Sequence, residues 1–495
     1  MTVRVSISYP PIETTKGTPL LSQNRQFQYF NEPTYIYPCV PAYGATMLRR
    51  ADHELSWDDG IAERLTLAQW FNRMEHLQPS LVCIETKAPT VKTYWRTINA
   101  LKERMPSTKV ALMGDHVTAF PEESLQNSRV DYAITGGDFD FLMVNLADHL
   151  ADGTPLEPGF WYRENGEVKT TGPFVQNHDV ENLPQIDRNL TKWWLYTKNG
   201  NFKYEPGTYT FVGRDCWWRK DGGCTFCSWT TTYKKFQVRR PESLVDEIEQ
   251  LVMRYGIREV FDDTGTFPVS GWLRKFCELM IERGLNEKVK FGCNMRFDAL
   301  TREEYQLMGK AGFRFILYGL ESANEKTLDR LNKGTTRQEA INACRWAKEA
   351  GLDPHLTIMM GYPWETYEEA QNTVNLAKYI FRKGWADTLQ ATIVIPYPGT
   401  PLWQQAKENG WLVTEDYDRF DMREAVLKSP LTNDQTKELA KDLYRVFLTP
   451  EYVIRKLLYL RSKDDVDFAW RGVRYVLGHL RDFSRGSEMQ GTKTI

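Results

Sequence analysis

Three of the eight cysteines of this 495-residue chain lie in one short stretch, at Cys216, Cys224 and Cys227. Thiolates bind metal ions, and three of them in one loop can converge on a single site. Structural zinc sites prefer four closed protein ligands in paired knuckles, and the sequence has no second Cys-x2-Cys pair. Three thiolates suit a 4Fe–4S cluster whose fourth iron is left for a substrate ligand. From the spacing alone, a zinc loop and a chance grouping of cysteines stay open.

The other five cysteines are far apart in the sequence: Cys39, Cys83, Cys277, Cys293 and Cys344. This scatter indicates ordinary buried thiols in a reducing compartment and not a disulfide framework. The first residues lack a basic region followed by an apolar run, so no signal peptide is predicted. No stretch approaches 18 apolar residues, so no transmembrane helix is predicted. With a net charge of -2, nothing favours nucleic acid as a partner. We therefore expect a cytoplasmic protein.

The cysteine loop follows the first strand of a repeated strand–helix pattern that spans residues 206–412. Short apolar runs predict strands at residues 208–213, 259–263, 288–293, 314–319, 355–360 and 388–395. Helices are predicted between them, at residues 241–255, 271–284, 302–312, 337–351 and 367–383. Six such units predict a partial or complete parallel barrel, in which chemistry lies at the carboxyl ends of the strands. The cysteine loop therefore opens at the expected catalytic face.

A similar alternation fills the N-terminal third of the chain. Strands are predicted at residues 3–9, 81–86, 109–113 and 131–135, with helices that include residues 91–105 and 139–150. This pattern is typical of a doubly wound parallel sheet, in which ligands bind beyond the carboxyl ends of the strands. The segments MGDHVTAF (113–120) and TGGDFDF (135–141) come directly after strands. They are therefore candidate binding loops.

Two further regions complete the predicted organisation. Residues 151–205 predict a polar linker with a hairpin whose turn is formed by Asn165 and Gly166. Residues 413–495 predict a helical region with an exposed polar tail after Arg485. We thus expect an α/β protein with four regions, at residues 1–150, 151–205, 206–412 and 413–495.

The strand ends of the predicted barrel resemble those of the radical S-adenosylmethionine (SAM) superfamily. The Cys-x2-Cys pair encloses the aromatic Phe226, as it usually does in that family. The resemblance also rests on FDDTGTF, CNMRFD, YGLESANEKTLDRLNKG, MMGYPWET and PYPGTPLW, which follow the order of the family's strand motifs. It implies a 4Fe–4S cluster on the three cysteines. One departure is the first cysteine interval, which has seven residues where the family commonly has three.

The resemblance also implies which side chains contact SAM. These are Phe226 in the loop and Asp262, Asp263, Thr264, Asn294, Arg296, Glu321, Ser322, Met359 and Gly361 at later strand ends. Structural alternatives stay open for several of them. Residues 262–264 could form a helix cap, Glu321 a salt bridge at the barrel top, and Arg296 an ion pair. Trp217, Trp218 and Trp229 could wall the substrate pocket or pack locally.

The N-terminal third narrows the resemblance to the cobalamin-binding branch of that superfamily. GDHVTAFPEESL, VDYAITGGDFDF and YIYPCVPAYGATMLRR resemble its cobalamin loops. The residues implied to lie at the cofactor are Asp115, His116, Val117, Thr118, Gly136 and Gly137. The cobalt-ligating motif D-x-H-x-x-G is absent, so His116 is expected to shape the loop and not to bind cobalt. The two glycines are expected to allow close approach of the corrin, the alternatives being a plain turn or a sheet that binds nothing.

Together these parts imply a cobalamin-dependent radical SAM methyltransferase. Cluster-bound SAM would yield a 5′-deoxyadenosyl radical that takes hydrogen from an unactivated carbon, and methylcobalamin would supply the methyl group. The carboxyl ends of the first sheet and the top of the barrel must then face each other across a surface lined by aromatic residues. No single residue is identified as catalytic.

Other readings of the same motifs remain. One is a cyclase or rearrangement enzyme with both cofactors and no methyl transfer. Another is a non-enzymatic iron–sulfur or cobalamin sensor, which a complete SAM motif set disfavours. An electron donor such as ferredoxin or flavodoxin is expected as a partner. The substrate is open: a peptide or protein side chain, a lipid, a tetrapyrrole or a secondary metabolite.

Overall fold

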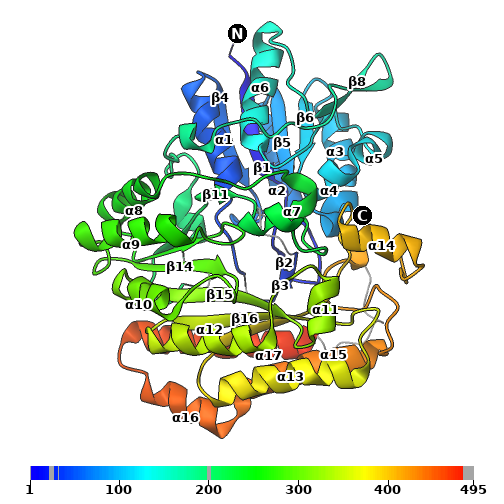
Figure 1. Cartoon of the computed structure of the whole chain (residues 1–495). Coiled ribbons are helices and arrows are strands. Elements are labelled where there is room, and N and C mark those ends of the chain that lie inside the picture. The colour runs from blue at the N-terminus through cyan, green and yellow to red at the C-terminus, as the bar shows by residue number, and fades with distance from the viewer. Residues whose placement is uncertain (1, 22–26, 32, 198–201, 483–495) are drawn as a thin grey trace.

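A computed structural model describes residues 2–21, 27–31, 33–197 and 202–482 of the chain. It is an α/β protein in which two parallel sheets lie one above the other, with a helical C-terminal region (Figure 1). The predicted fold class is therefore confirmed, including the partial barrel. The polar tail expected after Arg485 lies outside the described residues.

The first sheet has the strand order β4-β1-β5-β6-β7-β8-β9. Its parallel strands are β4 (Glu54–Asp59), β1 (Arg4–Tyr9), β5 (Leu81–Glu85), β6 (Lys109–Met113) and β7 (Tyr132–Ile134). The sequence patterns predicted all of them except β4, whose three acidic residues hide its apolar face. Because β1 lies between β4 and β5, the winding reverses there, as in doubly wound sheets.

The predicted hairpin is formed by β8 (Phe160–Glu164) and β9 (Glu167–Thr170). Its turn residues Asn165 and Gly166 have positive φ angles of 52° and 85°, which is the geometry that favours this pair. Since β8 pairs antiparallel with β7, the hairpin extends the first sheet. The hairpin predicted within residues 151–205 is therefore present, as two further strands of the first sheet.

Helices cover both faces of the first sheet. Along β5, Leu81 and Cys83 pack with α1 (Cys39–Arg50) and α6 (Phe139–Asp152). Val82 and Ile84 point to the other face, where α2 (Leu67–Leu77) and α3 (Ala88–Arg104) lie. This alternation of side chains along one strand is what lets a single sheet serve two cores.

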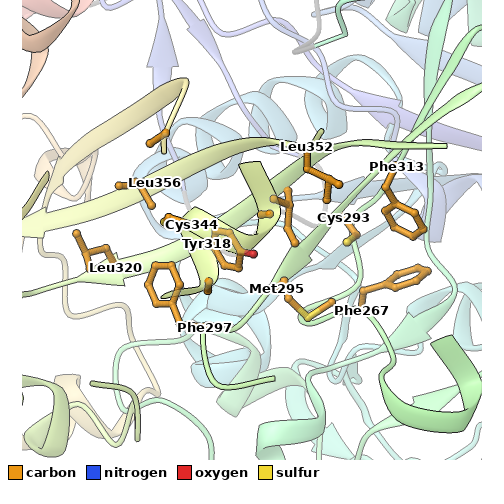
Figure 2. Close-up of a cluster of buried hydrophobic side chains, with 14 of the residues drawn as sticks. Phe267, Cys293, Met295, Phe297, Phe313, Tyr318, Leu320, Cys344, Leu352 and Leu356 are labelled. Atoms are coloured by element: carbon orange, nitrogen blue, oxygen red, sulfur yellow. The ribbon is translucent and has the colours of Figure 1, made fainter. Parts of the chain in front are cut away.

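The second sheet is a partial barrel of six parallel strands. In spatial order these are β10 (Gly207–Thr210), β13 (Glu259–Asp262), β14 (Lys290–Met295), β15 (Phe313–Glu321), β16 (Asp353–Met360) and β17 (Thr388–Ile393). Its outer face is covered by α8 (Pro241–Tyr255), α9 (Ser270–Glu282), α10 (Arg302–Lys310), α12 (Arg337–Glu349) and α13 (Tyr367–Arg382). Figure 2 shows part of the core between them, where Phe297 stacks on Tyr318 with ring centroids 4.6 Å apart.

The C-terminal region consists of α15 (Asn433–Tyr444), α16 (Pro450–Leu458) and α17 (Lys463–Asp482). The helix α15 packs on the barrel, where the Tyr444 hydroxyl accepts a hydrogen bond from the Ala391 amide at 3.0 Å. Searched across the described ranges, the chain has no helix that is long and apolar enough to span a membrane.

Four helices of the barrel and C-terminal region begin in the same way. Each has a threonine as N-cap and a Glu or Gln three residues later, and the two side chains satisfy each other's backbone amides. The threonines are Thr301 before α10, Thr336 before α12, Thr366 before α13 and Thr432 before α15.

Candidate cofactor-binding site

The three clustered cysteines follow β10 at its carboxyl end. They lie between β11 (Gly213–Arg214) and α7 (Trp229–Thr232), the short helix where the two sheets meet in Figure 1. Cys216, Cys224 and Cys227 are partly exposed, whereas the other five cysteines are buried. These three are thus the cysteines that are not fully enclosed by the protein.

The thiols do not form a ready-made metal site. Within the described part of the chain, no group of three or more His, Cys, Asp or Glu side chains is arranged to hold a metal ion. The Cys216 sulfur instead lies 3.0 Å from the Thr266 hydroxyl. Burial raises the pKa of the Cys224 thiol, although Lys333 lowers it. Cluster ligation by these residues therefore stays a prediction.

Distant motifs hold the cysteine loop in place through backbone bonds. The Thr225 amide donates to the Leu331 carbonyl at 2.9 Å, and the Thr225 carbonyl accepts from the Leu402 amide at 2.9 Å. The Trp218 indole donates to the Asn332 carbonyl at 2.7 Å. Leu331 and Asn332 belong to the fourth-strand motif and Leu402 to the last one. Part of what these motifs do is therefore to support the loop.

Asp262 and Thr264, predicted to contact SAM, are bonded within the barrel. The buried Asp262 carboxylate accepts from the Thr210 hydroxyl at 2.8 Å, the Val212 amide at 3.0 Å and the Thr264 amide at 3.1 Å. The Thr264 hydroxyl accepts from the Gly213 amide at 2.9 Å. Burial raises the pKa of Asp262, although these hydrogen bonds lower it. Both residues tie the end of β13 to the segment that leads into the cysteine loop.

Asp263 and Asn294 lie together at the ends of β13 and β14. The Asn294 side-chain amide donates to Asp263 at 3.2 Å and to the Thr264 carbonyl at 3.0 Å. The structure thus brings these predicted site residues together. Both lie at the barrel face that carries the cysteine loop.

Arg296 takes the structural alternative. Its guanidinium donates to both carboxylate oxygens of Asp298, at 3.0 and 2.8 Å. The same group stacks on the Trp218 ring, 3.9 Å from its centroid. Arg296 therefore supports the cysteine loop by packing against the Trp218 ring.

The end of β15 carries two buried polar contacts. Glu321, at a positive φ of 58°, accepts from the Lys333 ammonium at 3.1 Å, which is the salt bridge given as its structural alternative. The Ser322 hydroxyl donates to Glu365 at 2.6 Å. Lys333 and Glu365 are the next-to-last residues of the YGLESANEKTLDRLNKG and MMGYPWET motifs, and the sequence patterns did not single them out.

The remaining predicted barrel residues have packing roles. Met359 is buried in a small apolar core that Phe226 also contacts. Gly361 has a φ of 90°, and a Cβ there would lie 3.2 Å from the Thr436 methyl group of α15. Trp229 is buried against Phe211, so of the three tryptophans only Trp217 and Trp218 stay partly exposed.

Several polar atoms around the cysteine loop are left without a partner. Among the described residues, the Trp217 indole nitrogen and the hydroxyls of Thr225 and Tyr362 are buried and make no hydrogen bond. Buried polar groups are normally satisfied by protein, water or a ligand. With three accessible thiols, these donors fit a bound group with polar acceptors at this face of the barrel.

In the first sheet, His116 is turned away from the loop surface. Its ring is buried against Tyr417, with centroids 4.7 Å apart, and its Nε2 lies 2.9 Å from the Glu123 carboxylate. This placement supports a role in shaping the loop. Asp115 lies 3.5 Å from the Lys87 ammonium, and Val117 is fully buried.

The two predicted cobalamin loops contact each other. The Thr118 hydroxyl, at the end of the first loop, accepts from the Gly136 amide at 3.0 Å. A Cβ at Gly136 would lie 2.2 Å from the Phe174 ring, and one at Gly137 would lie 1.9 Å from the Tyr233 ring. In the structure, the space beside these two glycines is therefore occupied by the protein's own rings, those of Phe174 and Tyr233.

Arg214 was missed by the sequence patterns. It ends β11, two residues before Cys216, and forms a buried ion pair with Asp140 of α6. The signal was a charged residue at the end of the apolar run TYTFVG, since a buried arginine needs a buried partner. The partner could not be read locally, because it lies in the other sheet's loop.

Residues 211–377 match the Radical SAM superfamily. The chain carries a radical SAM domain. Over most of its length, the chain is 27% identical over 430 residues to an uncharacterised methyltransferase of Pyrococcus horikoshii, covering 85% of this chain and 90% of that protein. It is also 27% identical over 468 residues to the anaerobic magnesium-protoporphyrin IX monomethyl ester cyclase of Cereibacter sphaeroides, covering 90% and 71%.

A solved structure shares the whole architecture around the radical SAM domain. It is the radical SAM methyltransferase TsrM of Kitasatospora setae, with cobalamin and a [4Fe-4S] cluster bound. The TM-score is 0.69 over 97% of this chain and 100% of that one, at 15% identity. At this identity the likeness shows the fold.

Proposed function

We propose that this chain is a cobalamin-dependent radical SAM methyltransferase that methylates an unactivated carbon. One observation carries the proposal: the segment just after the cysteines lies against both candidate cobalamin loops. Tyr233 covers Gly137, and α7 packs against α4 (Asp115–Ala119). Groups bound at the cysteine loop and at the first sheet would therefore be neighbours.

The residues on this face fit the expected cofactors. Cys216, Cys224 and Cys227 would hold a 4Fe–4S cluster, and Asp263 and Asn294 lie at the face where SAM would bind. The loops at 115–118 and 136–137 would hold cobalamin. When bound, these three groups supply the radical and the methyl group. Support comes from the bound cofactors of the TsrM structure and the name of the Pyrococcus relative.

The chain itself orders the loops and excludes water. Phe211, Trp229 and Tyr233 of the barrel share one buried core with α1 and α6 of the first sheet. These three aromatic rings line the surface where the two units pack. A dry surface beside reactive groups suppresses side reactions with solvent.

A second candidate keeps both cofactors without methyl transfer. It is favoured by the cyclase relative from Cereibacter, whose match covers 90% of this chain. Ring closure and methylation would use the same loops, so only products separate them.

The test needs no knowledge of the substrate. The protein is reconstituted anaerobically with iron, sulfide and hydroxocobalamin, then given titanium(III) citrate and SAM with a trideuterated methyl group. We expect both 5′-deoxyadenosine and S-adenosylhomocysteine by mass spectrometry, and neither in Cys227→Ala. Deoxyadenosine without S-adenosylhomocysteine would favour the second candidate, and a protein that binds no iron would refute both.

A further inference from the structure

The cysteine segment is attached at both of its ends to one turn of the first sheet. Before the cysteines, Arg214 reaches Asp140; after them, Tyr233 covers Gly137. Gly137 lies in the turn that leads from β7 into α6, and Asp140 lies in the first turn of α6. The cysteine segment and this turn therefore cannot move independently.

The attachment through Arg214 is deeply buried. Its side chain is 1% exposed, and those of Asp138 and Asp140 are 0% exposed. Arg214 pairs with Asp140, and its Nε lies 3.9 Å from Asp138. The guanidinium also lies over the Phe211 ring, 5.4 Å from its centroid. Removing one partner of such a pair leaves an uncompensated buried charge, so each end holds the other in place.

The surroundings of the ion pair depend on the same turn. His178 stacks on Phe141 at 4.3 Å, and its Nδ1 lies 3.6 Å from Asp138. Among the described residues, both carboxylate oxygens of Asp138 and the Nη1 of Arg214 are buried without a hydrogen bond. Such a cluster is satisfied only in part by the protein, so its geometry is sensitive to small displacements of either element.

The attachment through Tyr233 rests on close packing and not on charge. Its ring fills the space where a Cβ of Gly137 would stand, and it packs edge-on against Trp229 with centroids 5.6 Å apart. Two residues earlier, Thr231 and Ala119 of α4 both lie against Gly399, at 2.8 and 2.7 Å from the position of its Cβ. The segment after Cys227 thus touches both candidate cobalamin loops.

We propose that the cluster site and the corrinoid site are thermodynamically coupled through this segment, with Arg214, Asp140 and Tyr233 as positioning residues. Assembly of the cluster orders the segment and raises the affinity of the first sheet for a corrinoid. By reciprocity, the corrinoid stabilises the bound cluster by the same factor, and we expect the stabilised arrangement to release its iron more slowly. The inference rests on the proposed function, because it needs both groups to bind.

The experiment measures hydroxocobalamin affinity by absorbance titration, with the cluster reconstituted and after its removal by a chelator. We expect about tenfold tighter binding with the cluster present. In Arg214→Gln and Asp140→Asn the ratio falls to below about twofold. The matched control is Arg314→Gln, which breaks another buried pair, with Glu259, at the amino ends of β15 and β13 and away from the cysteine segment. It keeps the wild-type ratio.

A second readout follows iron release. In wild-type protein, saturating hydroxocobalamin slows iron transfer to a chelator, and in Arg214→Gln it does not. Should the charge variants fail to fold, as judged by circular dichroism, Tyr233→Leu tests the other attachment and is expected to reduce the ratio as well. Equal affinities in wild type, or tenfold coupling kept in the folded variants, would overturn the inference. Protein that binds neither iron nor corrinoid would instead refute the proposed function.

Discussion

The two sheets meet at their carboxyl ends, yet they prepare those ends differently. At the barrel, polar side chains such as Asp262 and Asn294 fix the loops by hydrogen bonds to neighbouring strands. At the first sheet, missing side chains at Gly136 and Gly137 make room for rings from elsewhere. The barrel is thus sensitive to loss of a side chain and the first sheet to addition of one. Substitutions that remove a side chain from the barrel and substitutions that add one at the first sheet therefore test this contrast.

The largest effect is expected at the cysteines. Replacing Cys216, Cys224 and Cys227 together with Ala should abolish iron binding, because no other cysteine is accessible among the described residues. Iron content and charge-transfer absorbance measure it. The control is Cys344→Ala, at a buried thiol in the barrel core, which should keep its iron. Unchanged iron in the triple variant contradicts the assignment, and stoichiometric zinc would support a zinc loop.

Asp262→Ala should be the most destabilising single change at the barrel top. It leaves three buried donors without an acceptor, and the expected loss in unfolding free energy is on the order of 4 kcal/mol. Asp263→Ala should cost less stability but weaken SAM binding, and so lower both SAM-derived products together. Denaturant unfolding and calorimetric titration with SAM separate the two. A reversed pattern would mean that Asp262 is the ligand contact.

Gly137→Ala tests the first sheet. The added carbon would stand 1.9 Å from the Tyr233 ring, so we expect a loss of about 2–3 kcal/mol in unfolding free energy. In a Tyr233→Ala background the same substitution should cost much less, since the clashing ring is gone. Gly271→Ala is the control, because nothing lies within 4 Å of its Cβ position. An equal cost in both backgrounds would show that the ring is not the cause.

The last effect depends on pH. Burial raises the pKa of Glu85, at the end of β5, to about 7 from an ordinary value of 4.5. Because the folded protein holds this proton more tightly than the unfolded chain does, the free energy of unfolding falls as pH rises from about 4.5 to about 7. Glu85→Gln stays neutral, so it should be more stable than wild type at pH 8 by on the order of 3 kcal/mol and equal to it at pH 4. Thermal unfolding of both proteins at pH 4 and pH 8 measures this difference. If the difference in stability between Glu85→Gln and wild type is the same at both pH values, titration of Glu85 is not its cause.

The contrast also explains what the sequence could predict. The barrel strands and their helices were found to within about three residues at either end, because periodicity and strand-end motifs are local. The cysteine loop was located for the same reason. The partners of Arg214 and Gly137 were not, since Asp140 and Tyr233 come from the opposite unit and meet them only after the units dock. Strand β4 was missed because its acidic residues resemble a loop, although Asp58 and Asp59 are buried.

The threonine boxes at the starts of α10, α12, α13 and α15 have a consequence for synthesis. Each capping box lies within four consecutive residues. All the residues that fix the start of the helix have therefore been synthesised before the next strand emerges from the ribosome. A helix whose start needs no distant partner has fewer alternative starting positions. This limits misfolding in a chain built of repeated strand–helix units. The barrel can therefore be assembled in translation order, and the cysteine loop is held in place only after Leu331 and Leu402, which bond to Thr225, have been synthesised.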